Sequence, residues 1–290
     1  MRRIESSELI INTDGSIFHL HLKPEQLADT VILVGDPGRV DMISSFFSKV
    51  ECSVENREFK TSTGEFNGKR ISVVSTGIGT DNIDIVVNEL DALANIDLKE
   101  RVEKDVKKQL TLVRLGTSGA LQADIPVDSL VLTEIAIGFD GLLNFYANRD
   151  KVSDLSMEAA FLHHTQWNSQ CAKPYFVHSS PELVKLFSDF TISGVTISAP
   201  GFYAPQGRIL RLPLADNNLN DKIESFRYAN RKITNFEMES SAINGLSLLL
   251  GHKSTTICAI IANRVTKTAS PDYKPTVKRL VEKTLMKLTE

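Results

Sequence analysis

Short apolar runs rich in β-branched residues alternate along this chain with segments whose apolar residues follow the period of a helix. The runs span residues 31–34, 71–75, 111–115, 130–133 and 256–262. Strands that alternate with helices are typical of βα units, so the fold class is α/β. Two amphipathic helices should pack on the sheet. Their apolar stripes are Ile83, Val86, Val87 and Leu90, and Val277, Leu280, Val281, Leu285 and Leu288.

The chain shows no sign of a domain boundary, a membrane segment or a nucleic-acid-binding surface. No Pro-, Gly- or Ser-rich linker divides it, so residues 1–290 are expected to form one domain. The formal net charge of -3 provides no broad field for nucleic acid or an anionic membrane. The first 20 residues lack the apolar run of a signal peptide, and no stretch reaches the roughly 20 apolar residues of a membrane span. We expect a cytoplasmic protein with three reduced thiols and no zinc site.

Two further segments are expected to be structural. Asn67-Gly68 separates residues 59–66 from residues 70–74, and both residues tolerate positive φ, which predicts a hairpin turn. Residues 97–110 form a charge-dense insert with Val102, Val106 and Leu110 on one stripe. This spacing predicts a solvent-exposed helix with a narrow buried seam and no catalytic role.

Three glycine-rich motifs each follow a predicted strand. They are Gly35-Asp-Pro-Gly-Arg39, Thr76-Gly-Ile-Gly79 and Arg114-Leu-Gly-Thr-Ser-Gly119. A glycine turn that leads into a helix offers free N–H groups to an anion, although one such motif alone is usually only a tight turn. None of the three matches a dinucleotide fingerprint, a phosphate-binding P-loop or the Gly-x-Ser-x-Gly of a serine hydrolase. Together, at one end of a parallel sheet, they predict a ligand crevice.

With later motifs in the same order, the chain resembles the nucleoside phosphorylase superfamily, and specifically its uridine phosphorylase branch. The resemblance runs from Phe18 to Arg264. It implies a single-domain nucleoside phosphorylase fold, in which helices flank a mixed, twisted central sheet and the active site lies at the strand ends near a subunit interface. The later motifs are Arg57-Glu-Phe59, Phe202-(x)3-Gln206-x-Arg208, Asn235-x-Glu-Met-Glu239-Ser240 and Asn263-Arg264.

The resemblance implies a phosphate site made by two subunits. Gly35, Thr117, Arg39 and Arg114 would come from one subunit and Arg57 from its neighbour. Guanidinium groups bind phosphate oxygens at two points each, which also orients the attacking oxygen. Ser118 belongs to the same substrate-binding segment and is a poor candidate for a nucleophile.

The resemblance also assigns residues to the ribose. Glu239 would hold the ribose hydroxyls, with Met238 beneath the sugar and Glu237 helping to position the pair. His19 would reach across the dimer interface to the 5'-hydroxyl. Breaking an N-glycosidic bond builds positive charge on the sugar, which a carboxylate stabilises. The two glutamates are two residues apart at a predicted helix start, so they should not share a face, and we expect Glu239 to matter more.

The base would lie against Phe202, Gln206 and Arg208, with Arg264 nearby. Gln206 and Arg208 complement the amide-like edge of uracil, and Arg208 suits negative charge on the departing base. Purine-cleaving relatives carry an aspartate beyond the late strand, whereas this chain reads Ile-Ala-Asn-Arg over residues 261–264. Residues 204, 205 and 207 differ from the family's usual Pro-Gly-Gln-Glu-Arg run, so the base loop is expected to differ in conformation.

The predicted reaction is therefore the phosphorolysis of uridine to uracil and ribose 1-phosphate, with Arg114, Arg208 and Glu239 as catalytic residues. The alternatives are a purine or broad-specificity phosphorylase of the same fold, a nucleosidase that uses water, and a non-catalytic nucleoside-binding protein. No organic cofactor is implied. Glu58 and Ile78 match a potassium site at the dimer interface of some relatives, but Asn82 replaces the expected serine. A homodimer is the minimal unit expected, and the insert would affect assembly into a hexamer.

Overall fold

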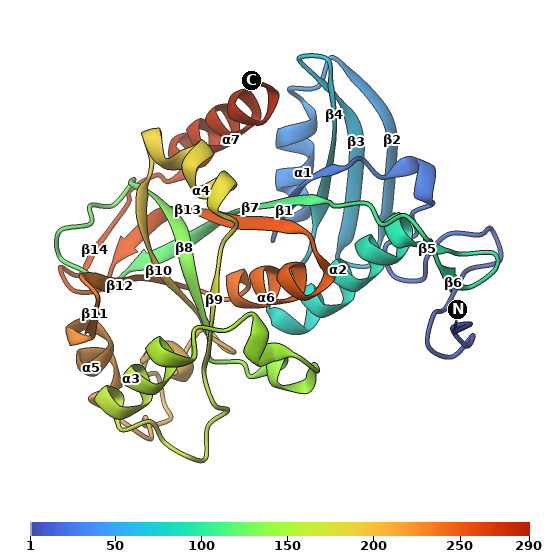
Figure 1. Cartoon of the computed structure of the whole chain (residues 1–290). Helices are drawn as coiled ribbons and strands as arrows, with labels where there is room; N and C mark the ends of the chain where they lie inside the picture. The colour runs from blue at the N-terminus through green and yellow to red at the C-terminus, as the bar shows by residue number, and fades with distance from the viewer. Residues whose placement is uncertain (1) are drawn as a thin grey trace.

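The computed structural model describes residues 2–290 and shows a twisted, mixed sheet with helices on both faces (Figure 1). β1 pairs in parallel with β4 and β7, and β7 in parallel with β13, whereas β8 runs antiparallel to β13. All five predicted runs lie in strands. In spatial order the strands are β11 (Arg227–Tyr228), β12 (Arg231–Glu237), β10 (Ile192–Ser198), β8 (Leu130–Gly138), β13 (Lys253–Asn263), β7 (Thr111–Ala120), β1 (Thr30–Val34), β4 (Lys69–Ser75), β3 (Phe59–Phe66) and β2 (Lys49–Asn56).

One half of the sheet closes on itself. The far end of β7 pairs antiparallel with β12, where Gly119 faces Phe236 and Ala120 faces Asn235. This pairing completes a ring of β7, β13, β8, β10 and β12. The ring brings the end of β12 next to the ends of β1 and β7, which positions residues that are distant in sequence at one cleft.

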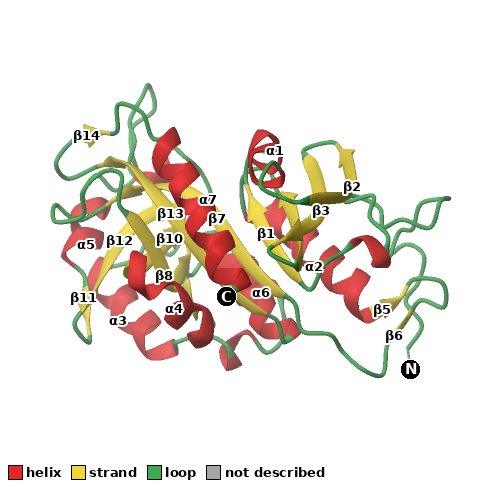
Figure 2. Ribbon diagram, turned by 90° about the horizontal axis from the view of Figure 1, so that it is seen from above, coloured by secondary structure: helices red, strands yellow, loops and turns green. Residues whose placement is uncertain are grey.

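The helices form two layers, one on each face of the sheet. Each strand contributes side chains to both layers, because successive residues point to opposite faces. Val31 and Leu33 of β1 face the core beneath α2 and α6, whereas Ile32 and Val34 face the core beneath α1, α4 and α7. Figure 2 shows α7 lying across β7 and β13. The two predicted helices are α2 and α7. The helices are α1 (Pro37–Ser44), α2 (Thr80–Asn95), α3 (Leu155–Thr165), α4 (Pro181–Phe187), α5 (Leu219–Ser225), α6 (Ser240–Leu250) and α7 (Lys274–Thr289).

The hairpin prediction is confirmed. β3 and β4 pair antiparallel around Asn67 and Gly68, whose φ values are 49° and 75°. Both values are positive, as this tight turn requires. The remaining short elements are β5 (Ile96–Asp97), β6 (Val102–Glu103), β9 (Tyr175–His178), β14 (Thr268–Ala269) and the 3-10 turns η1 (Pro24–Gln26), η2 (Leu142–Phe145), η3 (Arg149–Lys151), η4 (Ser188–Phe190) and η5 (Ala204–Gln206).

The helical prediction for residues 97–110 is wrong. α2 ends at Asn95, and β5 pairs antiparallel with β6 in a small hairpin followed by extended chain. The Asp97 carboxylate accepts hydrogen bonds from the N–H groups of Lys99 and Glu100, which turns the chain away from the helix. Val106, assigned to the buried seam, is 82% exposed.

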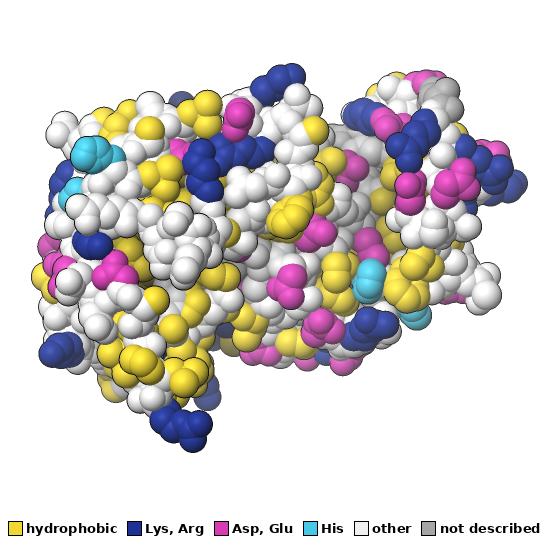
Figure 3. Space-filling view, turned by 90° about the horizontal axis from the view of Figure 1, so that it is seen from below, with side chains coloured by type: hydrophobic (Ala, Val, Ile, Leu, Met, Phe, Trp, Pro, Cys, Tyr) yellow, Lys and Arg dark blue, Asp and Glu magenta, His cyan; other side chains and the backbone are white. Residues whose placement is uncertain are grey.

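Acidic and basic side chains are interspersed over the face in Figure 3, as the small net charge suggests. No helix among residues 2–290 is long and apolar enough to cross a bilayer. Within that range the structure also shows no cluster of His, Cys, Asp or Glu suited to a metal ion. Cys52, Cys171 and Cys258 are free thiols.

Candidate active site

A cleft of about 610 Å³ opens at the ends of β1, β4, β7 and β12. Its walls contain all but three of the residues that the sequence assigns to phosphate, ribose and base. The exceptions are His19, Arg57 and Arg264. The predicted residues that line the cleft are Gly35, Arg39, Arg114, Thr117, Ser118, Phe202, Gln206, Arg208, Glu237, Met238 and Glu239.

Two of the glycine motifs form adjoining turns at one end of the cleft. A Cβ atom on Gly35 would lie 3.3 Å from the carbonyl oxygen of Gly77, so the two backbones approach closely. Gly35 leads into α1, and the carboxylate of Asp36 accepts the N–H of Gly38 at 2.9 Å. The third motif is not a turn, because β7 continues through Gly119 to Ala120. Thr117 and Ser118 therefore reach the cleft from a strand.

Arg39 and Arg114 form a basic floor beside these turns. Arg39 donates to the carbonyl oxygen of Leu115 at 3.1 Å, and burial together with the nearby Arg114 lowers its pKa. Arg114 is almost fully buried and contacts two carboxylates. Those carboxylates raise the pKa of Arg114 against the opposing effect of burial. Both guanidinium groups therefore stay charged and can attract an anion.

Glu237 and Glu239 meet at Arg114, which corrects the expectation that they do not share a face. Glu237 is the last residue of β12 rather than part of a helix, and Glu239 immediately precedes α6. The carboxylate of Glu237 lies 3.3 Å from Arg114, accepts the hydroxyl of Ser198 at 2.5 Å and accepts the N–H groups of Glu239 and Ser240. Its oxygens are thus occupied by protein groups, as a positioning role requires.

Glu239 has fewer protein contacts than Glu237. One oxygen accepts the N–H of Gly79 at 2.8 Å and the other contacts the Arg114 guanidinium. Burial raises the pKa of Glu239, and the neighbouring Glu237 raises it further, while Arg114 opposes both. Glu239 also borders the cleft next to Met238. The arrangement suits hydrogen bonding to sugar hydroxyls.

Phe202, Gln206 and Arg208 form one group in the lining of the cleft. The Arg208 guanidinium lies 3.8 Å from the centre of the Phe202 ring and donates to Gln206 Oε1 at 2.6 Å. Gln206 is buried, in a 3-10 turn that ends at Gly207 with φ of 69°. This loop presents an aromatic face together with amide and guanidinium donors.

Arg264 does not line the cleft but holds this loop through a hydrogen bond. Its guanidinium donates to the carbonyl oxygen of Gln206, and its carbon atoms pack near Gly119. Partial burial, and then Arg208, lower its pKa to about 10. The neighbouring Asn263 donates to the carbonyl oxygens of Gln122 and Ile125. Ile261 and Ala262, which do line the cleft, are apolar.

His19 and Arg57 lie together outside the cleft. The Arg57 guanidinium is 5.8 Å from the Phe18 ring centre, and the amide of Asn56 donates to the carbonyl oxygen of His19 at 2.8 Å. Arg57 is exposed and has φ of 57°, at the turn between β2 and β3. Neither residue lines the cleft of its own chain, and their assignment to a neighbouring subunit stays a prediction.

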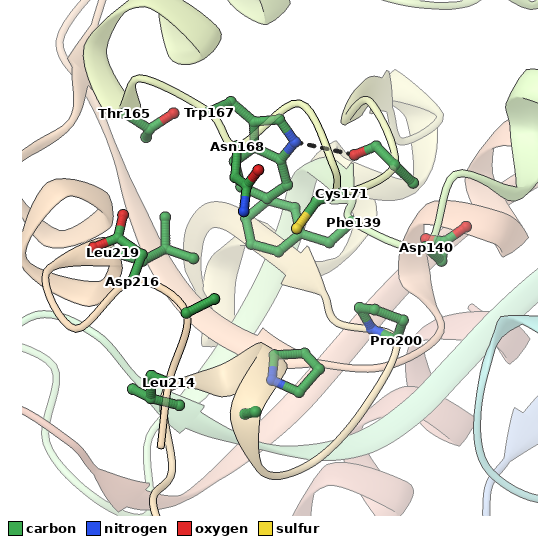
Figure 4. Close-up of a pocket in the computed structure, with 14 residues that line it drawn as sticks. Phe139, Asp140, Thr165, Trp167, Asn168, Cys171, Pro200, Leu214, Asp216 and Leu219 are labelled. Carbon is green, nitrogen blue, oxygen red and sulfur yellow. Dashed lines mark hydrogen bonds between the residues drawn. The ribbon is translucent and has the colours of Figure 1, made fainter. Parts of the chain in front are cut away.

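A second cavity, of about 380 Å³, also borders the base loop, at Ala204 and Pro205. Figure 4 shows the residues that line it. Its walls are mostly apolar, with Phe139, Trp167 and Pro200 among them, and the Trp167 indole N–H is already bonded to the carbonyl oxygen of Ala172. No arginine or lysine lines it. The cavity therefore does not suit phosphate.

Comparison with known proteins agrees with this geometry. A uridine phosphorylase from Thermococcus kodakarensis is 28% identical over 268 residues, which cover 92% of this chain and 84% of the relative. A DeoD-type purine nucleoside phosphorylase from Bacillus velezensis is 36% identical over 115 residues, covering 39% of this chain and 44% of the relative.

The fold matches as well. A crystal structure of Trypanosoma brucei nucleoside phosphorylase, described as showing uridine phosphorylase activity, superposes with a TM-score of 0.86 at 31% identity. The match covers 97% of this chain and 99% of the other. The family model of the phosphorylase superfamily matches residues 29–290. With its mixed sheet, its cleft lined by arginines and these matches, the chain belongs to the phosphorylase superfamily.

Proposed function

We propose that the protein is a pentosyltransferase that cleaves uridine with inorganic phosphate, giving uracil and ribose 1-phosphate. The observation that carries this proposal is that one cleft brings together two groups of side chains. Arg39, Arg114 and Glu239 line it, and so do Gln206 and Arg208. Several relatives named uridine phosphorylase support it.

The proposed chemistry follows from this arrangement. Phosphate binds at Gly35, Thr117, Arg39 and Arg114 of one subunit and at Arg57 of the partner subunit. Glu239 holds the ribose hydroxyls above Met238, and His19 of the partner subunit reaches the 5'-hydroxyl. As the glycosidic bond breaks, positive charge grows on the sugar and negative charge on the base. Glu239 and the bound phosphate stabilise the first charge, and Arg208 stabilises the second. A phosphate oxygen then bonds to the sugar carbon, and uracil leaves.

A purine phosphorylase is the second candidate, because part of the chain is similar to a DeoD-type relative. Departure of a purine is assisted by a group that protonates the base. At the corresponding position, Asn263 cannot supply a proton, and its amide group is held by two main-chain carbonyl oxygens. The apolar Ile261 and Ala262 face the cleft in its place. These contacts favour a pyrimidine.

We infer a homodimer as the minimal active unit, since His19 and Arg57 lie outside the cleft of their own chain. A hexamer stays a prediction, as does a potassium ion at the dimer interface. Glu58 and Asn82 do lie near Gly77, where a Cβ atom would come 3.2 Å and 2.5 Å from them.

The cytoplasm is the proposed location, in keeping with three free thiols. No organic cofactor is proposed.

The test is a panel of nucleosides incubated with the purified protein, with and without phosphate, followed by identification of the sugar product. We expect strict phosphate dependence, because the half-buried Arg39 donates to a main-chain carbonyl oxygen and forms no ion pair among residues 2–290, so phosphate would supply the anion that it lacks. We also expect uridine to be cleaved far faster than inosine, adenosine or cytidine. Equal turnover in phosphate-free buffer with release of free ribose would establish a nucleosidase, and a preference for inosine would establish the purine enzyme.

A further inference from the structure

Glu89 of α2 holds the segment that carries His19. Its two carboxylate oxygens accept the main-chain N–H groups of His19 and Leu20 at 2.9 to 3.1 Å. The same carboxylate lies 2.6 Å from Nδ1 of the His19 imidazole. The Glu89 side chain is 12% exposed and has no lysine or arginine partner among residues 2–290. All hydrogen bonds of the Glu89 carboxylate within residues 2–290 therefore go to His19 and Leu20.

The contact determines which imidazole nitrogen carries hydrogen. Both oxygens of Glu89 already accept main-chain N–H groups, and a carboxylate has no hydrogen to donate. The hydrogen between the two side chains therefore belongs to His19 Nδ1. In the neutral imidazole, Nε2 is then an acceptor. No group among residues 2–290 forms a hydrogen bond with His19 Nε2.

The imidazole is also fixed in orientation. The Phe18 ring lies edge-on at 4.7 Å between centroids and the Phe59 ring at 6.3 Å. The side-chain amide of Asn56 donates to the carbonyl oxygen of His19 at 2.8 Å. Asn56 directly precedes Arg57 in the sequence, so this bond also ties Arg57 to His19. His19 and Arg57 thus form one preassembled unit on the surface of the chain that donates them. In this unit, His19 Nε2 is the hydrogen-bond acceptor and the Arg57 guanidinium is the cation.

We infer that Glu89 is a positioning residue that sets the tautomer of His19, so that Nε2 accepts a hydrogen bond from a hydroxyl of the ligand in the neighbouring subunit. The inference rests on the proposed function, in which that hydroxyl is the ribose 5'-hydroxyl. Glu89 touches no substrate. It makes the protein selective for nucleosides that present a donor at this position over those that lack it, because an unpaired acceptor loses binding.

The activity test compares uridine with 5'-deoxyuridine. We expect the protein to prefer uridine in kcat/KM by about tenfold, the size of one hydrogen bond. Glu89→Gln, whose NH2 group cannot accept the main-chain N–H bonds, should remove most of that preference and leave the KM for phosphate unchanged. His19→Ala should remove it equally, and the double variant should be no worse than His19→Ala alone. Glu100→Gln, at an exposed acid of the β5–β6 hairpin, is the matched control and should retain the preference.

A second readout does not depend on activity. In the intact protein labelled with ¹⁵N-histidine, the His19 signal, assigned by its loss in His19→Ala, should show a protonated Nδ1 and a bare Nε2. Glu89→Gln should shift it toward the mixture of tautomers found in free imidazole. An unperturbed tautomer in Glu89→Gln would overturn the inference, as would an unchanged preference for uridine in that variant. If no nucleoside is cleaved, the proposed function fails, whereas the tautomer still reports on Glu89.

Discussion

Burial and mutual contacts shift the pKa values of the charged residues in the cleft. Arg114 lies between Glu237 and Glu239, and a Cβ atom on Gly116 would come 2.1 Å from its guanidinium nitrogen, so a glycine is needed there. The sequence predicted these residue types from family motifs. It did not predict that both glutamates reach Arg114, because those contacts require β12 to end beside β7.

Arg208 is predicted to be the main electrostatic support of the leaving base. Arg208→Ala should reduce turnover of uridine by about 10²–10³-fold, comparable to the loss of an oxyanion donor. Phosphate binding should change little, because Arg39 and Arg114 supply that site. Steady-state kinetics with each substrate varied in turn separate the two effects. Arg211→Ala, at an exposed arginine of the same loop, is the control. Unchanged uridine turnover in Arg208→Ala would contradict the proposed role.

Glu239 should make uridine binding depend on pH. Burial raises its pKa above the ordinary carboxyl value of 4.5, so the group stays protonated to higher pH than an exposed glutamate. The ionised form accepts the ribose hydroxyls. Affinity should therefore rise as pH increases through this raised pKa, by up to about tenfold per pH unit below it. Calorimetric titration with uridine without phosphate, between about pH 5 and pH 8, avoids the titration of phosphate itself. Glu239→Gln should bind uridine weakly, with an affinity that does not change with pH. If the affinity of that variant still rises with pH, another group is responsible for the dependence.

At the scale of elements, the base loop shows what local sequence can predict. The departure from the family's usual loop sequence predicts a different conformation, which stays a prediction, and Gly207 has a left-handed φ at the end of η5. The contacts that hold the loop were not predictable, since Asn220 of α5 and Arg264 both donate to the carbonyl oxygen of Gln206. The insert prediction failed for a related reason: the Asp97 side chain competes for N–H groups that helical periodicity alone assigns to a helix.

Gly207→Ala tests this loop. A Cβ atom there would lie 2.2 Å from the Asn220 amide nitrogen, and the left-handed backbone costs a non-glycine residue about 1–2 kcal/mol. We expect KM for uridine to rise by about tenfold, which corresponds to about 1.4 kcal/mol, with no change in KM for phosphate. Gly68→Ala is the matched control, because Gly68 has φ of 75° and no atom near its Cβ position. It should lose similar stability in thermal unfolding and keep both KM values. Parallel effects of the two changes on KM would show that the loop does not set base affinity.

At the scale of the molecule, alternation of strands and helices was enough to predict the class, the five central runs and the two long helices. The closed ring was not predictable, because it depends on pairing of Gly119 with Phe236 across much of the chain. That ring is what brings Glu239 to Arg114. The site of one chain is nevertheless incomplete in the proposed mechanism, since His19 and Arg57 do not line its cleft.

Subunit complementation tests this division between chains. Arg57→Ala and Arg114→Ala dimers should each be nearly inactive. In a mixed dimer, one site combines the intact Arg114 of the first chain with the intact Arg57 of the second, while the other site lacks both. After full exchange of equal amounts, half of the dimers are mixed, so activity should recover to about a quarter of the unmodified value. Arg39→Ala mixed with Arg114→Ala is the control, because both arginines serve the cleft of their own chain and neither site of the mixed dimer is complete. Mass spectrometry of differently tagged chains confirms exchange. If exchange is complete and the first mixture gains no more activity than the control, Arg57 does not act across the interface.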